Sequence, residues 1–120
     1  LINSGTEFNY IFANNDMMAQ GCYNALKDAG KENIPIVSTG GSPDGFKMLQ
    51  DGIEAANMTA PVSIQGVKTF MNLYNKVALG EDPAEKFTAL PVIPVSADDT
   101  SSYIAWDDYA AAYKYLGENK

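Results

Sequence analysis

The sequence predicts an α/β fold with a parallel sheet built from βαβ layers and with helices on both faces. Two observations support this prediction. Three short apolar runs are each followed by an amphipathic stretch of helical spacing, and a glycine closes each of these stretches. Because parallel neighbours need a crossover between them, the repeated unit favours parallel pairing. The length of 120 residues, 46% of them apolar, indicates a single α/β lobe over residues 1–120.

The first unit begins with "NYIFAN" at residues 9–14, an apolar and aromatic run that reads as a strand. An amphipathic helix follows and ends at Gly30. We expect Asp16 to be the N-cap of this helix and Met17 to be its first residue, because aspartate is a preferred capping residue.

The second unit repeats the pattern. "NIPIVSTG" at residues 33–40 predicts a strand, and "SPDGFKMLQDG" predicts a helix with Ser42 as its N-cap and Pro43 in its first turn. Gly52 is the expected stop of this helix. Residues 53–60 read as a third, short strand.

The rest of the chain adds two helices and one strand. A long amphipathic helix is predicted over residues 62–80, and a polar connector follows it. Residues 90–96 read as a strand, whose two prolines favour the edge of a sheet. A terminal helix is predicted over residues 106–117. The tail of residues 98–120 fits two roles, a helix that packs on the rest of the protein or a surface for a partner.

The composition excludes several classes of function. The net charge of −7 leaves no basic patch for a phosphate backbone, so we expect no nucleic-acid partner. With no histidine and a single cysteine, Cys22, we expect no metal site, no cofactor and no Ser-His-Asp catalysis. No apolar run reaches the length of about 20 residues that spans a bilayer, and the start at Leu1 does not read as a signal peptide. The first residues resemble the end of a helix, so we expect a fragment of a longer protein.

Ligands of open α/β sheets bind beyond the carboxyl ends of the strands, so the residues after each strand are the candidates. After the first strand these are Asn14, Asn15 and Asp16, whose polar groups suit a polyhydroxylated ligand; capping alone also explains Asp16. After the second strand they are Gly40 and Gly41, with backbone N–H groups near a helix start. A tight strand-to-helix turn explains this glycine pair equally well. A dinucleotide site is disfavoured, because the G-x-G-x-x-G spacing is absent.

The order of these segments resembles a known family. "YIFANNDMMAQGCYNALKDAG", "IPIVSTGGSPDGFKMLQDG", "APVSIQG" and "PVIPVS" are similar to the C-terminal lobe of the sugar-type periplasmic, or type I, substrate-binding proteins of bacterial ABC transporters. The resemblance runs to about Ser96. It implies that Asn15, beside Asp16, hydrogen-bonds a sugar. The family's second strand usually ends in an aspartate that binds sugar hydroxyls, where this chain has Gly40, and a third polar position falls near Thr59.

The resemblance implies a solute-binding component of an ABC importer, which closes two lobes on a sugar-like ligand and performs no chemistry on it. Residues 61–88 would cross toward the second lobe, and an ABC permease would be the partner. The implied location is periplasmic or extracellular, with or without a lipid anchor. We also expect self-association of the fragment through the helix of residues 62–79, whose apolar stripe would be exposed.

Two other functions are compatible with this type of fold. The effector domains of lactose-repressor-like transcriptional regulators share it and are the alternative function. An enzyme on a flavodoxin-like sheet is disfavoured by the lack of histidine and of a nucleotide-binding loop in the sequence.

Overall fold

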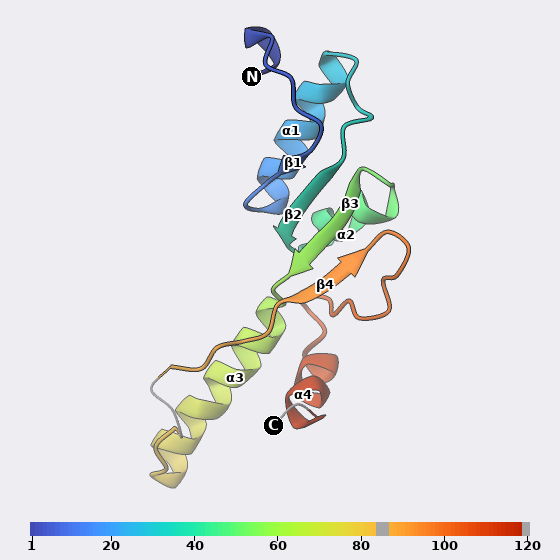
Figure 1. Ribbon diagram of the computed structural model, residues 1–120. Coiled ribbons are helices and arrows are strands. Elements are labelled where there is room, and N and C mark those ends of the chain that lie inside the picture. Colours follow the sequence, from blue (N-terminus) through green and yellow to red (C-terminus); the bar gives the residue numbers. More distant parts are fainter. Residues whose placement is uncertain (84–86, 119–120) are drawn as a thin grey trace.

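The structure is a computed structural model that describes residues 1–83 and 87–118. It contains a four-stranded sheet in the order β1-β2-β3-β4 (Figure 1). The strands are β1 (Ile11–Phe12), β2 (Ile36–Gly40), β3 (Glu54–Thr59) and β4 (Ile93–Ser96). The helices are α1 (Asp16–Asp28), α2 (Pro43–Gln50), α3 (Val62–Tyr74) and α4 (Tyr109–Glu118), with a 3-10 turn at Ile2–Ser4 and a π-helical turn at Asn75–Leu79. The predicted α/β class is confirmed.

The signals read from the second unit fix the ends of α2. Ser42 is its N-cap, and the Ser42 Oγ accepts a hydrogen bond from the Gly45 N–H at 3.1 Å. Pro43 is the first helical residue, where its missing N–H costs nothing. Gly52 adopts a φ of 72°, which glycine tolerates and which turns the chain toward β3. These three predictions are confirmed.

The strand directions explain the edge position of β4. β1, β2 and β3 pair in parallel, as the repeated unit predicted. β4 pairs antiparallel with β3 and ends the sheet. Pro94 lies within β4, and a proline fits an edge strand because it has no N–H to donate to a further neighbour. The edge position predicted from the prolines is confirmed.

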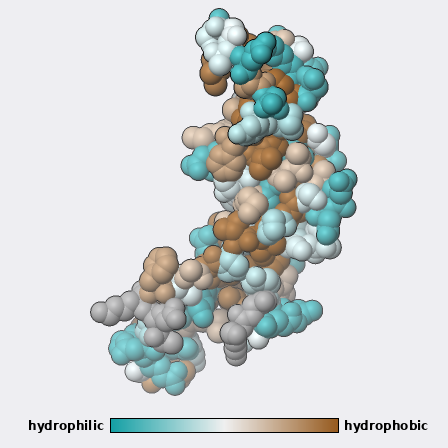
Figure 2. Space-filling view, in the orientation of Figure 1, coloured by the Kyte–Doolittle hydropathy of each residue, from teal (hydrophilic) through white to brown (hydrophobic). Residues whose placement is uncertain are grey.

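The arrangement of α1 and α2 differs from the expectation of helices on both faces, because these two helices lie together on one face. The two helices contact each other. This agrees with the rule that βαβ crossovers are right-handed, because two such crossovers that advance in the same direction, from β1 to β2 to β3, place their helices on the same side. Their buried side chains form one core around Ile36. On the opposite face, Phe12 and Met58 remain 60% and 38% exposed. Figure 2 shows hydrophobic residues gathered over the middle of the molecule, where the sheet lies.

The helix α3 points away from the sheet and gives the molecule an elongated shape of 60 × 27 × 18 Å (Figure 1). α4 packs against α3. A second core forms where α2, α3, β4 and α4 meet, from Leu49, Ile64, Ile93, Val95 and Ala112. Residues 84–86 of the expected crossing segment and residues 119–120 of the tail lie outside the described residues.

Candidate functional site

The parallel strands bring three segments together at the end of the sheet where β1, β2 and β3 terminate, which we call the edge. Gly40 at the end of β2 is paired with Thr59 at the end of β3, and the Gly40 carbonyl accepts a hydrogen bond from the Ala60 N–H at 3.0 Å. On the other side of β2, the Ala13 N–H donates to the Val37 carbonyl at 2.9 Å. The segments that follow β1, β2 and β3 are therefore neighbours, as the rule for parallel sheets predicts.

Asn15 occupies the cap position that the sequence assigned to Asp16. α1 begins at Asp16, and the Asn15 Oδ1 accepts a hydrogen bond from the Met18 N–H at 2.8 Å. The expected cap was wrong by one residue, because asparagine and aspartate cap equally well and the sequence holds both in succession. Asn14 and Asn15 are exposed at the edge. Since the cap uses Oδ1, the Nδ2 amide of Asn15 is the group that remains to donate outward.

Asp16 lies beneath the edge and supports it from inside. Its side chain is 5% exposed, and its Oδ2 accepts the Ser42 N–H at 2.7 Å. Its Oδ1 accepts the Ser38 hydroxyl at 3.0 Å and the Asn57 amide at 2.8 Å. Burial by itself would raise the pKa of Asp16, but hydrogen bonds from Ser42, Asn57 and Ser38 hold it below 3.8. This carboxylate thus joins α1 to β2, to β3 and to the loop before α2.

A second buried carboxylate, Glu54, completes this group and was missed in the sequence. Glu54 is fully buried in β3. The Ser38 hydroxyl lies 2.8 Å from its Oε1, and the Asn57 Nδ2 lies 2.9 Å from its Oε2. We call Asp16, Ser38, Glu54 and Asn57 the buried polar cluster. The available signal was a glutamate and an asparagine within a short run that otherwise reads as a strand.

The donors of the buried polar cluster favour a protonated Glu54. The Ser38 hydroxyl has a single hydrogen, yet it lies within hydrogen-bond distance of both Asp16 and Glu54. A proton on Glu54 resolves this conflict, since Glu54 then donates to Ser38 while Ser38 donates to Asp16. Burial is the main cause that raises the pKa of Glu54, and the charge of Asp16 raises it further against the hydrogen bonds of Asn57 and Ser38.

We call Gly40 and Gly41 the glycine loop; backbone conformation and packing require glycine at both positions. Gly40 has a φ of 134° and Gly41 a φ of 72°, which other residues rarely adopt. A Cβ on Gly40 would lie 2.8 Å from the Asp16 Oδ2, and one on Gly41 would lie 2.6 Å from the Thr59 Cβ. The structure therefore bears out the tight-turn interpretation of this pair, and the turn still leaves its backbone at the edge.

The segment before α4 folds back onto the glycine loop. The Tyr103 hydroxyl donates to the Gly41 carbonyl at 3.1 Å, and the Trp106 Nε1–H donates to the Gly40 carbonyl at 3.3 Å. The Tyr103 ring also stacks on Phe46 of α2, with centroids 3.8 Å apart. No local sequence signal predicts these contacts, because more than 60 residues separate their partners.

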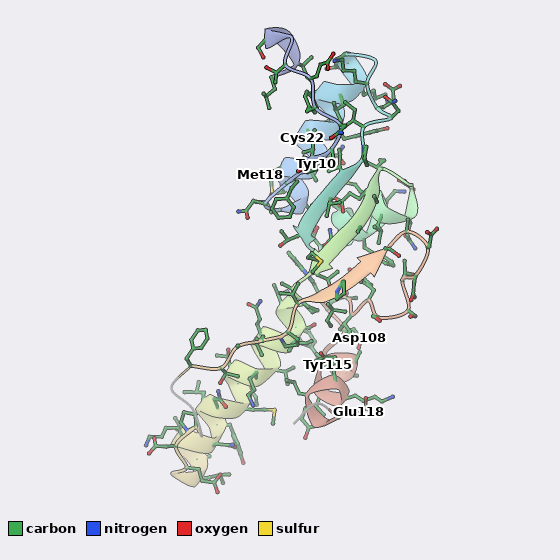
Figure 3. All side chains as sticks on the ribbon, viewed as in Figure 1. Tyr10, Met18, Cys22, Asp108, Tyr115 and Glu118 are labelled. Carbon is green, nitrogen blue, oxygen red and sulfur yellow. The ribbon has the colours of Figure 1, made fainter. Side chains whose placement is uncertain are left out.

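The helix α4 begins later than predicted. Its first residue is Tyr109, and the Asp108 Oδ1 accepts the Ala111 N–H at 2.8 Å, which caps the helix. Figure 3 shows Asp108 beside the start of α4. The predicted start at Trp106 was wrong, because residues 103–106 are held against the glycine loop.

Two general properties concern the described part of the chain alone. Within residues 1–83 and 87–118, no helix is both long and apolar enough to cross a bilayer. In the same ranges, no group of three or more acidic or cysteine side chains is arranged to hold a metal ion.

The chain is similar in sequence to proteins of known name. No family model matches the chain. The chain is 34% identical over 90 residues to the ribose import binding protein of Escherichia coli, a match that covers 72% of this chain and 29% of that protein. The ribose import binding protein of Salmonella typhimurium is 34% identical over 87 residues, with the same coverage. The chain spans less than a third of the length of these relatives.

Solved structures share the fold over nearly the whole chain. A solute-binding protein of an ABC transporter from Bacillus halodurans with bound myo-inositol has a TM-score of 0.71 at 23% identity, over 98% of this chain and 36% of that one. A galactofuranose binding protein has a TM-score of 0.69 at 26% identity, over 97% and 36%. The arabinose-binding component from Shewanella has a TM-score of 0.67 at 23% identity, over 98% and 36%. The structural match therefore extends past Ser96, where the resemblance was expected to end, and includes α4.

Proposed function

The chain is homologous to one part of the sugar-binding proteins of bacterial ABC transporters, and we propose that it forms one wall of a site that captures a sugar-like solute for such an importer. The sequence relatives are named for ribose import. The similar solved structures are a complex with myo-inositol, a galactofuranose binding protein and a component of an arabinose transporter. Ribose, myo-inositol, galactofuranose and arabinose are all small molecules with several hydroxyl groups. A polyhydroxylated solute is therefore the class of ligand that we assign.

One observation carries this proposal: three segments that follow parallel strands meet at one edge and present neutral polar groups there. Asn14 and Asn15 are exposed beside the glycine loop. The Asn15 cap uses Oδ1, which leaves the Nδ2 amide as a donor. Neutral donors and acceptors match hydroxyl groups without the cost of burying a charge. Asp16 contributes indirectly, by holding these segments in place.

Gly40 restricts the ligand at one point. The resemblance implies an aspartate that binds sugar hydroxyls at the position of Gly40. The carboxylate that would meet a Cβ on Gly40, that of Asp16, already accepts three hydrogen bonds. A hydroxyl placed at this point would lack a side-chain acceptor, and an unpaired buried polar group costs about 1–3 kcal/mol. The preferred solute therefore has fewer hydroxyls at this point, or a bulkier group that fills the space.

Enclosure of the ligand would need a second lobe. The chain spans 29% of its sequence relatives and about a third of the solved structures. The crossing segment, residues 61–88, would lead toward that lobe, and closure of two lobes on a hinge would hold the solute without chemical change. Delivery to an ABC permease on the periplasmic or extracellular side, with or without a lipid anchor, completes the proposed role. The relatives favour this role over that of a transcriptional regulator.

On its own, the chain would self-associate. Phe70, Leu73 and Val77 on α3 and its π-helical turn are 66%, 60% and 76% exposed. Apolar side chains gathered on one projecting helix are typical of a surface that another protein covers. A second copy of the chain is the occupant that we propose.

The test is a titration of the isotope-labelled chain with D-ribose, myo-inositol and L-arabinose, followed by the amide resonances of Asn15 and Gly41. L-leucine is a control ligand of similar size with a single carboxylate and no hydroxyl. We expect weak, saturable shifts of both resonances with at least one of the polyols, because half a cleft binds without enclosing. Shifts that are equally small for the polyols and for leucine would contradict the proposal.

A further inference from the structure

We infer that Tyr103 and Trp106 are positioning residues, which hold the glycine loop so that the Gly41 N–H faces the edge as a hydrogen-bond donor to the solute. This inference deepens the proposed function and rests on it. Neither aromatic side chain needs to touch the solute, because both act through the backbone of the loop.

The two aromatic side chains complete the hydrogen bonding of the loop carbonyls. The Gly40 carbonyl accepts the Ala60 N–H at 3.0 Å and the Trp106 Nε1–H at 3.3 Å, which uses both of its lone pairs. The Gly41 carbonyl accepts the Tyr103 hydroxyl at 3.1 Å. Both carbonyl directions are therefore fixed.

A fixed carbonyl also fixes the N–H of the same peptide. The peptide bonds are trans, so each N–H points to the side opposite its carbonyl. The Gly40 carbonyl points toward β3, so the Gly41 N–H points toward the end of β1, where Asn15 lies. The next peptide agrees with this rule, because the Gly41 carbonyl faces Tyr103 while the Ser42 N–H donates to Asp16 at 2.7 Å.

The Gly41 N–H is the donor that this arrangement leaves available. Among the described residues, no hydrogen-bond acceptor is recorded for it. This backbone donor recognises a ligand oxygen, whereas an aspartate at Gly40 would accept from a ligand hydroxyl, so the two groups select different ligand atoms.

The hydrogen bonds from Tyr103 and Trp106 matter because glycine peptides rotate easily. Gly40 and Gly41 both have positive φ values, and two successive glycines reach other conformations at little cost. The segment of residues 103–106 is itself held by two contacts. The Tyr103 ring stacks on Phe46 of α2, and the Ala105 carbonyl accepts the Ser63 hydroxyl of α3 at 3.1 Å. The orientation of the loop is therefore set by side chains of two helices.

The test compares Trp106→Phe and Tyr103→Phe, each of which removes one donor and keeps an aromatic ring. Tyr109→Phe is the matched control, since Tyr109 is 63% exposed on α4. The first readout is the chemical shift and hydrogen-exchange rate of the Gly41 amide in the labelled chain, which needs no ligand. The second is the affinity for myo-inositol and D-ribose. Thermal unfolding identifies any variant that fails to fold.

We expect both loop variants to shift the Gly41 resonance and to weaken polyol binding about threefold to tenfold, the loss of one positioning hydrogen bond. Tyr109→Phe should change neither readout. If both folded variants keep the wild-type Gly41 resonance and affinity, the inference is overturned. If Gly41 responds to the variants while the wild-type chain binds no polyol, the positioning role stands and the proposed function fails.

Discussion

Asn15 serves the fold and the proposed site with two different atoms. Its Oδ1 caps α1 by accepting the Met18 N–H, and its Nδ2 is left to donate outward. The two tasks can therefore be separated by substitution. An aspartate keeps the capping acceptor and lacks the donor, whereas an alanine lacks both.

We predict that Asn15→Ala lowers the free energy of unfolding by about 1 kcal/mol, the usual loss of an N-cap, and that Asn15→Asp leaves it nearly unchanged. Both variants should weaken polyol binding to a similar extent, because both lack the amide donor. Urea unfolding and the polyol titration measure the two effects. Wild-type affinity in folded Asn15→Asp would exclude the Nδ2 amide as a ligand contact.

Glu54 makes the stability of the chain depend on pH in a direction opposite to Asp16. Its raised pKa means that the folded chain keeps a proton that the unfolded chain releases above pH 4.5. The free energy of unfolding therefore falls as the pH rises from 4.5 toward the folded-state pKa. The pKa of Asp16 is lowered, so its contribution is present above pH 3.8 and is lost as the pH falls below that value.

We predict that Glu54→Gln removes the decline of stability above pH 4.5, since an amide donates to Ser38 as a protonated carboxyl does and does not titrate. Urea unfolding at a series of pH values measures this. Glu32→Gln is the matched control, because Glu32 is exposed and its substitution should leave the pH profile as in the wild type. A decline that persists unchanged in Glu54→Gln would show that Glu54 does not hold the proton.

At the scale of the elements, Gly45 determines how closely α2 approaches α1. A Cβ on this residue would collide with the carboxylate of Asp16, which is itself fixed by Ser38, Asn57 and Ser42. Glycine is thus required in the first turn of α2 for packing. Gly66 in α3 provides the contrast, because a Cβ there would meet nothing within 4 Å.

We predict opposite effects for the same substitution at these two helical glycines. Gly45→Ala should destabilise the chain by about 1–3 kcal/mol, as expected for overpacking against a buried group. Gly66→Ala should stabilise it by about 0.5–1 kcal/mol, since alanine favours a helix more than glycine does. Thermal unfolding of both variants checks this. Equal effects of the two substitutions would mean that the Asp16 carboxylate moves to make room for the added methyl group.

The elements were predictable where local signals act and less so where distant parts meet. Ser42, Pro43 and Gly52 mark the ends of α2 through contacts within a few residues, so the sequence alone located that helix. The antiparallel direction of β4 and the late start of α4 depend on contacts with β3 and with the glycine loop. No local pattern carries such information.

The candidate site shows the same division. The edge residues follow from the rule for parallel sheets, and Asn14, Asn15 and the glycine loop were found in this way. The buried polar cluster was not found, because its hydrogen bonds join residues 16 to 41 positions apart, apart from the bond between Asn57 and Glu54. The assignment of Asn14, Asn15 and the glycine loop as ligand contacts stays a prediction.

At the scale of the whole molecule, the projecting helix dominates the surface. Leu73 and Val77 are 60% and 76% exposed, near the end of α3 and in the π-helical turn that follows it. α3 begins after β3 and points away from the sheet (Figure 1). A second copy that covers this helix would leave the candidate site open. We therefore expect the proposed self-association and the proposed solute binding to be independent of each other.

We predict that the chain forms dimers or larger species in sedimentation equilibrium, and that the double variant Leu73→Lys and Val77→Lys is monomeric, because two charges are costly to bury at an apolar contact. Met17→Lys is the matched control. Met17 is 86% exposed on α1, so its substitution should leave the association unchanged. A wild-type chain that remains monomeric at high concentration would contradict the prediction.

β4 joins the sheet only after the chain has left it and returned. The Thr59 hydroxyl donates to the Ile93 carbonyl across a separation of 34 residues, whereas β1, β2 and β3 are joined by short crossovers. Closing the longer excursion costs more chain entropy before any contact is gained, so non-local pairing forms late in folding. We expect pulse-labelled hydrogen exchange during refolding to protect the Val37 amide before the Val95 amide. Until β4 pairs during refolding, β3 presents an unpaired strand edge to other chains.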